Sequence, residues 1–204
     1  ITQYFSAWGV VYGSILLLYT ILYMLTILLM EKKDKEIYKG LSDTDALTGL
    51  FNRRAFQAAV DETLLKRIAG VFIFIDVDNF KDYNDKYGHA NGDLCLKHFA
   101  ATMKKCFPKD SILGRYGGDE FVVYIKNAAS DDAHRYMDEF QREISHLMMS
   151  GGEHVTVSAS AGGVAFIGEG EDFVSLCRSA DNMLYDVKRN GKGTFKIKGA
   201  KKAC

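Results

Sequence analysis

The chain has 204 residues, with 26 Lys and Arg against 26 Asp and Glu, and its formal net charge is zero at pH 7. This length allows one domain of ordinary size plus an additional element. The balanced charge argues against a partner that is a nucleic acid polymer bound by bulk electrostatics. The four cysteines, Cys95, Cys106, Cys177 and Cys204, form no CxxC pair, which fits free thiols in a reducing cytosol.

The first thirty residues contain no charged side chain. Residues 9–30 are dominated by Leu, Ile, Val, Tyr and Met, and a helix of that length spans roughly 30 Å, the thickness of a bilayer core. A secretory signal peptide and a buried core helix are the alternatives, but the segment lacks a charged n-region and is too long for a signal h-region. We therefore predict a transmembrane helix within residues 1–30, with Tyr4, Phe5 and Trp8 as an interfacial aromatic belt.

Lysines follow the apolar stretch directly, at Lys32, Lys33, Lys35 and Lys39. By the positive-inside rule they place the downstream domain in the cytoplasm, so we expect a single visible span in the inner (cell) membrane. We interpret residues 31–43 as a helical signalling linker, and a solvated spacer is an equally good interpretation. Because the chain starts just before the span and without Met, we expect it to be the C-terminal part of a longer membrane receptor whose upstream sensor domain is missing.

The rest of the sequence alternates between strand and helix patterns. Strands alternating with helices, together with a hairpin, predict an α/β fold with a mixed central sheet flanked by helices. The expected elements are a helix at 53–68, a strand at 71–76, a helix at 94–107, a hairpin at 111–126, a helix at 131–148, a strand at 155–165, a helix at 173–187 and an edge strand at 195–197.

Two carboxylates follow the most apolar of these strands. Residues 70–75 form a continuous apolar run, typical of a strand buried on both faces, and Asp76 and Asp78 come directly after it. A carboxylate at the end of a buried strand is costly unless it is paired or binds a metal. With the Val77 carbonyl between them, the two acids offer hard oxygen ligands of the kind that Mg²⁺ prefers.

A second pair of acids lies at the turn of the expected hairpin, in Gly117-Gly118-Asp119-Glu120. The four residues alone are compatible with an ordinary polar turn. However, successive side chains of an extended strand point to opposite faces. One acid can therefore face a cleft while the other anchors a loop or a cation.

The segment Arg115-Tyr-Gly-Gly-Asp-Glu-Phe121 resembles the signature of the GGDEF family of diguanylate cyclases. Four further segments resemble the family in its own order, and together they cover residues 44 to about 198. The resemblance implies a palm-like nucleotide cyclase (GGDEF) fold for residues 44–200, with a short tail at 201–204. The other segments are residues 45–54 (DALTGLFNRR), 76–81 (DVDNFK), 84–93 (NDKYGHANGD) and 180–188 (ADNMLYDVK).

The resemblance also implies an activity. Two GTP molecules would condense to cyclic di-GMP and two pyrophosphates at the interface of a two-fold homodimer, by a two-metal mechanism with two Mg²⁺ (or Mn²⁺) ions per active site. The alternative is a catalytically weak or inactive GGDEF domain that acts as a GTP-binding regulatory module. A membrane-anchored scaffold without nucleotide chemistry is a more distant alternative.

Carried over residue by residue, the resemblance assigns Asp76, the Val77 carbonyl and Asp119 as metal ligands. Glu120 is a further catalytic acid beside Asp119, and either of the two assists deprotonation of the attacking hydroxyl. The sequence does not divide these roles between them.

Four residues are assigned to the phosphates. The backbone N–H groups of Asn79 and Phe80 would contact phosphate where the next helix begins, and Lys188 matches the family's phosphate-binding lysine. Lys192 stands where the family usually has arginine, so the charge is kept and the bidentate fork is lost, which lowers triphosphate affinity. For both lysines the alternative is an ordinary solvated helix end.

Asn84 and Asp93 are assigned to the guanine base. An ionised carboxylate accepts from both N1–H and N2–H₂ of guanine, whereas adenine presents an acceptor at N1, so Asp93 favours GTP over ATP. The alternative is that Asp93 is the N-cap of the helix that follows. We interpret Gly88, His89 and Gly92 as structural turn residues.

One departure from the family pattern has a functional consequence. Many members carry an inhibitory product site, Arg-x-x-Asp, that ends four residues before the signature arginine. Pro108 and Ser111 occupy those two positions here. We therefore predict that this chain has no inhibitory product site.

Overall fold

The computed structural model describes the backbone of residues 2–145, 147–148, 154–168 and 170–199. Residues 1–42 and 43–204 form two separate compact units. The side chains of Tyr4, Phe5, Trp8 and the lysines of the predicted linker lie outside the described set, as do residues 201–204.

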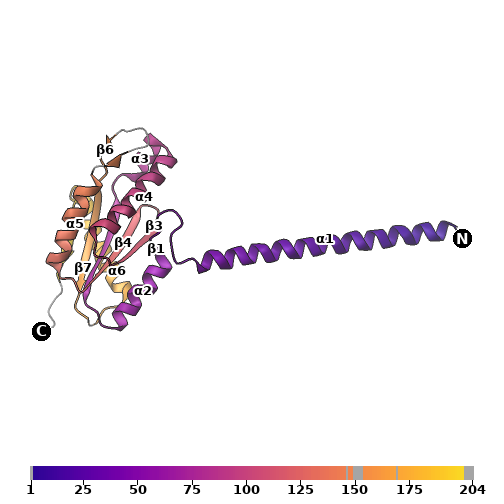
Figure 1. The fold of residues 1–204 in the computed structure, drawn as a ribbon, viewed down its shortest axis with the longest axis horizontal. Helices are drawn as coiled ribbons and strands as arrows, with labels where there is room; N and C mark the ends of the chain where they lie inside the picture. The colour runs from indigo at the N-terminus through magenta and orange to yellow at the C-terminus, as the bar shows by residue number, and fades with distance from the viewer. Residues whose placement is uncertain (1, 146, 149–153, 169, 200–204) are drawn as a thin grey trace. The chain divides into compact units, whose positions relative to one another are not determined.

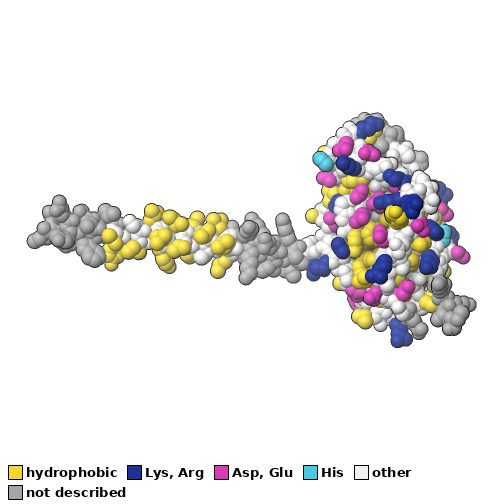
Figure 2. Space-filling view, turned by 180° about the vertical axis from the view of Figure 1, so that it is seen from behind, with side chains coloured by type: hydrophobic (Ala, Val, Ile, Leu, Met, Phe, Trp, Pro, Cys, Tyr) yellow, Lys and Arg dark blue, Asp and Glu magenta, His cyan; other side chains and the backbone are white. Residues whose placement is uncertain are grey.

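The first unit is one helix, α1 (Thr2–Leu41), of 40 residues. Its segment Val11–Met30 has a mean hydropathy of 2.1 and is unburied within the unit, so its length and composition suffice to cross a membrane. Hydrophobic side chains cover this segment in Figure 2. The helix continues through the predicted linker as far as Leu41.

The second unit is built on a six-stranded mixed sheet (Figure 1) with the order β1-β3-β4-β2-β7-β8. The pairs β1–β3 and β7–β8 are parallel, and the others are antiparallel. The prediction of a mixed sheet with an edge strand near residue 196 is therefore confirmed. The strands are β1 (Phe51–Asn52), β2 (Gly70–Val77), β3 (Ile112–Gly117), β4 (Glu120–Lys126), β7 (Ala159–Phe166) and β8 (Phe195–Lys198).

Helices cover both faces of this sheet (Figure 1). On one face α4 (His89–Cys106) and α5 (Ser130–Ile144) form a core with one side of β2, and on the other α2 (Arg53–Leu65) and α6 (Phe173–Arg189) form a second core. The short helix α3 (Phe80–Tyr87) links β2 to α4. A separate two-stranded ladder joins β5 (Leu147–Met148) and β6 (His154–Val155).

The central strand β2 explains the apolar run in the sequence. All its residues are buried, and it is paired on both edges, with β4 and β7. Val71, Ile73 and Ile75 belong to the first core, whereas Phe72 and Phe74 belong to the second. The strand therefore has no solvent face on which polar residues could alternate.

Several predicted boundaries were wrong, and helix α2 ends at Leu65 rather than residue 68. Helix α4 begins at His89 rather than residue 94, and α5 ends at Ile144, so Leu147–Met148 is a strand. The strand predicted over residues 155–165 is interrupted between β6 and β7. In that interval the Ser158 carbonyl accepts from the Asp78 amide at 2.9 Å, so its backbone is tied to the segment that follows β2.

Candidate active site

Strand pairing brings the two predicted groups of acids together. Strands β2 and β4 are antiparallel, so the end of β2 lies beside the start of β4, and Asp76 is the register partner of Glu120. The Val77 amide donates to the Asp119 carbonyl at 3.2 Å. Residues more than forty positions apart in the sequence thus converge on one acid cluster, which we define as Asp76, Asp119 and Glu120.

Burial and mutual repulsion disfavour the ionised forms of the carboxylates in the acid cluster. Burial raises the pKa of Asp76, which is 8% exposed, and the neighbouring Asp119 and Asp78 raise it further, while Lys188 opposes them. Burial likewise raises the pKa of Glu120, followed by the charges of Asp76 and Asp119. An added cation would relieve this repulsion.

The donor set fits a hard divalent cation. The cluster offers carboxylate oxygens beside the Val77 carbonyl, which are the ligands of Mg²⁺. Within the described residues no three His, Cys, Asp or Glu side chains are arranged to hold an ion by themselves. An ion at the acid cluster would therefore complete its shell with backbone, water or substrate oxygens, as Mg²⁺ usually does.

Arg115 holds the turn that carries Asp119. Its Nε and Nη2 donate to the Gly118 carbonyl at 2.9 and 2.7 Å, and its Nη1 donates to Asp45 Oδ1 at 3.1 Å. Gly118 has φ +47°, a conformation that favours glycine. The sequence assigned no role to Arg115 or Asp45, although both lie in the segments that resemble the family.

Asp78 has a different role from Asp76. Its carboxylate accepts from the hydroxyls of Ser158 and Ser160 at 2.8 and 2.6 Å and from the Gly193 amide at 2.9 Å. The sequence grouped Asp78 with Asp76 as a hard oxygen donor. The structure instead shows it as an anchor between β2, β7 and the turn that precedes β8.

The predicted phosphate residues lie at the same end of β2. Helix α3 begins at Phe80, and Asn79 precedes it in the left-handed conformation. Lys188 Nζ is 2.8 Å from Asp76 Oδ2, and Lys192 Nζ donates to Asn79 Oδ1 at 2.8 Å. Both ammonium groups thus have partners at the end of β2, rather than ending in solvent alone.

The predicted guanine residues come from two consecutive helices. Gly88, with φ +82°, ends α3 and begins α4, which carry Asn84 and Asp93. Asn84 Oδ1 is buried and accepts no hydrogen bond from the described residues. A Cβ atom on Gly92 would lie 1.8 Å from this oxygen, so only glycine leaves room for the amide beside Asp93.

Two interpretations of this segment were wrong. Asp93 is an exposed residue within α4, which begins four positions earlier, so Asp93 does not cap the helix. Gly92 is a helical residue rather than a turn residue, and His89 opens the helix. The prediction of a turn at Gly88 is confirmed.

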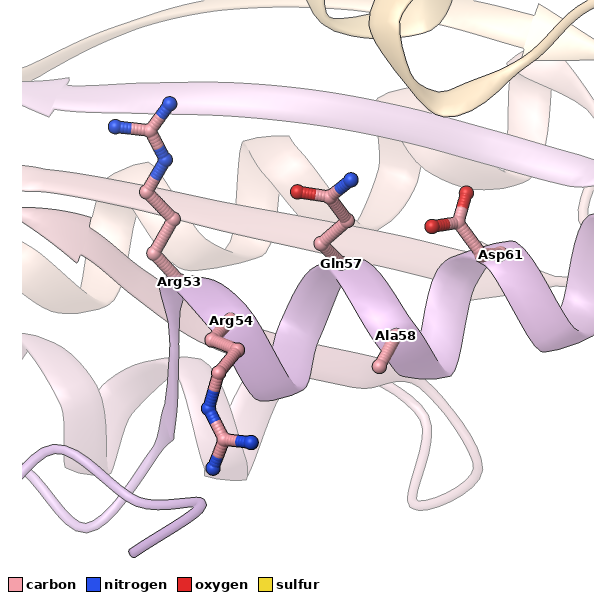
Figure 3. A pocket seen from close by; sticks show the side chains of 5 residues that line it. All are labelled: Arg53, Arg54, Gln57, Ala58 and Asp61. Atoms are coloured by element: carbon pink, nitrogen blue, oxygen red, sulfur yellow. The ribbon is translucent and has the colours of Figure 1, made fainter. Parts of the chain in front are cut away.

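A hollow of about 510 Å³ lies elsewhere, along one side of α2 (Figure 3). Arg53, Gln57 and Asp61 follow one another at i, i+4 and i+8 on this helix, and the remaining lining residues are Arg54 and Ala58. The Arg53 guanidinium lies 4.3 Å from the centre of the Tyr116 ring, next to the signature glycines. None of the predicted site residues lines this hollow.

An acid cluster at the end of a buried strand, beside lysines and a helix start, provides the groups that a site for a nucleoside triphosphate with a divalent cation needs. Residues 42–194 match the family model described as "Diguanylate cyclase, GGDEF domain". The chain therefore belongs to the GGDEF family of diguanylate cyclases.

Curated relatives include cyclases and one phosphodiesterase. The chain is 34% identical over 167 residues to the response regulator PleD of Caulobacter vibrioides, covering 78% of this chain and 37% of PleD. It is 34% identical over 164 residues to a diguanylate cyclase of Vibrio cholerae (78% and 50%), and 32% identical over 168 residues to the cyclic di-GMP phosphodiesterase PdeR of Escherichia coli (81% and 25%). The chain thus spans between a quarter and a half of the length of these relatives.

Solved structures confirm the GGDEF fold. The GGDEF domain of DgcB from Caulobacter crescentus, in complex with c-di-GMP, superposes with a TM-score of 0.70 at 29% identity, covering 76% of this chain and 92% of that chain. The diguanylate cyclase SiaD from Pseudomonas aeruginosa, in complex with its activator SiaC, gives 0.72 at 27% identity (96% and 77%).

Proposed function

We propose that this chain is a diguanylate cyclase that condenses two GTP molecules to cyclic di-GMP and two pyrophosphates. The observation that carries the proposal is the acid cluster of Asp76, Asp119 and Glu120 with the Lys188 ammonium 2.8 Å from Asp76. A triphosphate needs both features, because its negative charge must be neutralised while an attacking hydroxyl loses its proton.

The remaining residues would position the substrate. Asp93 and the Asn84 oxygen, which accepts from none of the described residues, would accept from the guanine N–H groups, which selects GTP. The amides of Asn79 and Phe80, with Lys188 and Lys192, would hold the phosphates at the start of α3. Two Mg²⁺ or Mn²⁺ ions, bound by Asp76, the Val77 carbonyl and Asp119, would supply charge neutralisation at the attacking and leaving oxygens.

The bond changes define what the acids must do. A new bond joins the 3′ oxygen of one GTP to the α-phosphorus of the other, and the bond from that phosphorus to pyrophosphate breaks. Asp119 or Glu120 takes the hydroxyl proton. The same step then takes place with the roles of the two nucleotides exchanged, which closes the ring and releases the second pyrophosphate.

Each domain would bind one GTP, so the active form would be a two-fold homodimer whose sites face each other. We propose that α1 anchors the chain in the inner membrane and that the catalytic unit lies in the cytoplasm. The unit would then be the output domain of a membrane receptor, controlled by how the receptor pairs two copies.

A regulatory GTP-binding module is the second candidate. Lys192 in place of arginine supports it, as does the match to a relative that is named a phosphodiesterase. This candidate binds GTP but forms no product, so one assay separates the two functions.

The test uses the full chain in detergent micelles with GTP and Mg²⁺, and detects cyclic di-GMP by mass spectrometry. Asp119→Ala should abolish product, whereas Asp110→Ala, the same change in an exposed turn, should leave it intact. The rate per chain should rise with protein concentration if a dimer is the active form. GTP binding without product would identify the regulatory module instead.

The prediction of no inhibitory product site can be tested in the same assay. Pro108 and Ser111 form a tight turn, in which the Ser111 amide donates to the Pro108 carbonyl at 3.0 Å. Neither residue offers the charges of an Arg-x-x-Asp site. Added cyclic di-GMP should therefore leave the initial rate unchanged, and tight product binding at this turn would contradict the prediction.

A further inference from the structure

The last turn of α6 and the turn that follows it contact the polar residues Asp76, Asp78 and Asn79 at the end of β2. Lys188 pairs with Asp76, the Gly193 amide donates to Asp78, and Lys192 donates to Asn79. We call this set of contacts, between residues 188–193 and 76–79, the clasp. It joins the proposed metal ligand and the proposed phosphate loop to the two proposed phosphate lysines.

Within the clasp the two lysines have partners of different charge. Lys188 Nζ lies 2.8 Å from a carboxylate oxygen of the acid cluster, and the Asp76 side chain is 12% exposed. Lys192 Nζ lies 2.8 Å from the neutral amide oxygen of Asn79. Lys188 is therefore the lysine of the clasp that is ion-paired with the acid cluster, whereas Lys192 has a neutral partner.

We propose that Lys188 and the divalent cation compete for Asp76, so that the metal binds tightly only together with the nucleotide. This inference rests on the proposed function, because it takes the metal and the triphosphate as the ligands of the site. Lys188 is then a positioning residue with two alternative partners: Asp76 before nucleotide binds and a phosphate afterwards.

The competition follows from charge and distance. A divalent cation on Asp76 would share a carboxylate with an ammonium that is already within hydrogen-bond distance, and two cations so close repel each other. Moving Lys188 away from Asp76 leaves the lysine without its ion-pair partner until a phosphate arrives. The triphosphate therefore removes the competitor and adds oxygen ligands to the metal at the same time.

The test measures metal affinity rather than turnover. Mn²⁺ binding to the full chain in detergent micelles is followed by the electron paramagnetic resonance signal of free Mn²⁺, without nucleotide. Lys188→Met should tighten Mn²⁺ binding about tenfold, which corresponds to about 1.4 kcal/mol. Lys192→Met is the matched control: it removes the same charge from the same segment but frees no carboxylate, so it should change the affinity by no more than about twofold.

A second arm measures the coupling with nucleotide. A non-hydrolysable GTP analogue should tighten Mn²⁺ binding strongly in the parent chain and much less in Lys188→Met, because the competitor is already gone. Asp76→Asn should abolish the effect of Lys188→Met. Lys188→Gln serves as a second variant, and circular dichroism confirms that each variant is folded.

The outcomes separate this inference from the proposed function. Equal Mn²⁺ affinities of Lys188→Met and either the parent or Lys192→Met would overturn the inference, as would the absence of Mn²⁺ binding to Lys188→Met. If cyclic di-GMP forms but Lys188→Met does not change the Mn²⁺ affinity, the cyclase proposal is retained and the competition is rejected. If the Mn²⁺ affinity changes as predicted but no cyclic di-GMP forms, the competition is retained and the cyclase proposal is rejected.

Discussion

Substitution of Gly92 by alanine should damage guanine binding without damaging the fold. The added Cβ atom would lie 1.8 Å from Asn84 Oδ1 and 2.9 Å from its Cγ. An ordinary contact needs about 3.5 Å, so the Asn84 amide must retreat by more than about 1.5 Å. The clashing atoms are the far end of a flexible side chain rather than backbone, which makes the movement inexpensive for folding.

The substitution should affect folding stability and GTP binding in opposite directions. Gly92 lies within α4, where alanine is favoured over glycine by about 1 kcal/mol, so the free energy of unfolding should stay level or rise slightly. Loss of one hydrogen bond to an uncharged donor costs about 0.5–1.5 kcal/mol, which corresponds to a KM for GTP that is about 2- to 12-fold higher. Pyrophosphate release as a function of GTP concentration measures KM, and thermal denaturation measures stability.

A double-mutant cycle makes the test specific for Asn84. Asn84→Ala should raise KM by a similar factor, and Gly92→Ala added to Asn84→Ala should cause no further loss, because the clashing amide is gone. If the two effects multiply instead, or if Gly92→Ala alone leaves KM unchanged, Asn84 is not the group through which Gly92 acts, and the assignment of Asn84 to guanine is wrong.

Three further predictions follow from single features of the chain. Asp78→Asn should lower the free energy of unfolding by about 2–4 kcal/mol in chemical denaturation, because three donors lose a charged acceptor. For Asp45, burial raises the pKa, but hydrogen bonds from neighbouring donors, Arg115 among them, together lower it below 3.8. The stabilisation by Asp45 is therefore complete above pH 3.8 and is lost as the pH falls through the lower folded-state pKa. Asp45→Asn should flatten the acid limb of a curve of folding stability against pH. An unchanged acid limb would contradict this prediction. Leu18→Arg with Leu22→Arg, in the centre of α1, should move the chain from the carbonate-resistant membrane fraction to the supernatant, and retention in the membrane would argue against a span.

The parts of the fold that were predicted correctly have strong local signals. The run at 70–75 is apolar on both faces because β2 lies between β4 and β7 and contributes alternate side chains to two cores. The hairpin was predictable because its two apolar strands are joined by glycines, one of which needs φ +47°. These signals depend on residues close together in sequence.

The start of α4 was missed because tertiary contacts override local propensity there. Residues 89–93 (HANGD) contain glycine and asparagine, which favour turns over helix interiors. In the structure Gly92 is helical and buried against the Asn84 amide. The free energy by which a single residue favours a turn is small compared with the stabilisation that this packing and the continuation of the helix provide.

The clasp could not be predicted at all, because it joins residues more than a hundred positions apart. Its geometry depends on Lys192, which has φ +59°, and on Asn79, which has φ +55°. Neither is glycine, and although asparagine tolerates this conformation, lysine gives no sequence signal for it. Resemblance identified both lysines as phosphate ligands, but it did not show that one of them is paired with a proposed metal ligand.

The different roles of Asp76 and Asp78 show why alternation in an extended chain is insufficient to define a metal site. Alternation puts the two carboxylates on one side of the strand, yet β2 ends at Val77 and the Asp78 amide is bonded to the Ser158 carbonyl instead of to β4. The Asp78 carboxylate already accepts three hydrogen bonds, so it has little capacity left for a cation. Asp76 has one cationic partner and three acidic neighbours, so it gains most from a cation, which in our proposal replaces Lys188. The two aspartates therefore have different roles: Asp78 fixes the end of the strand, and Asp76 remains available to exchange Lys188 for a divalent cation.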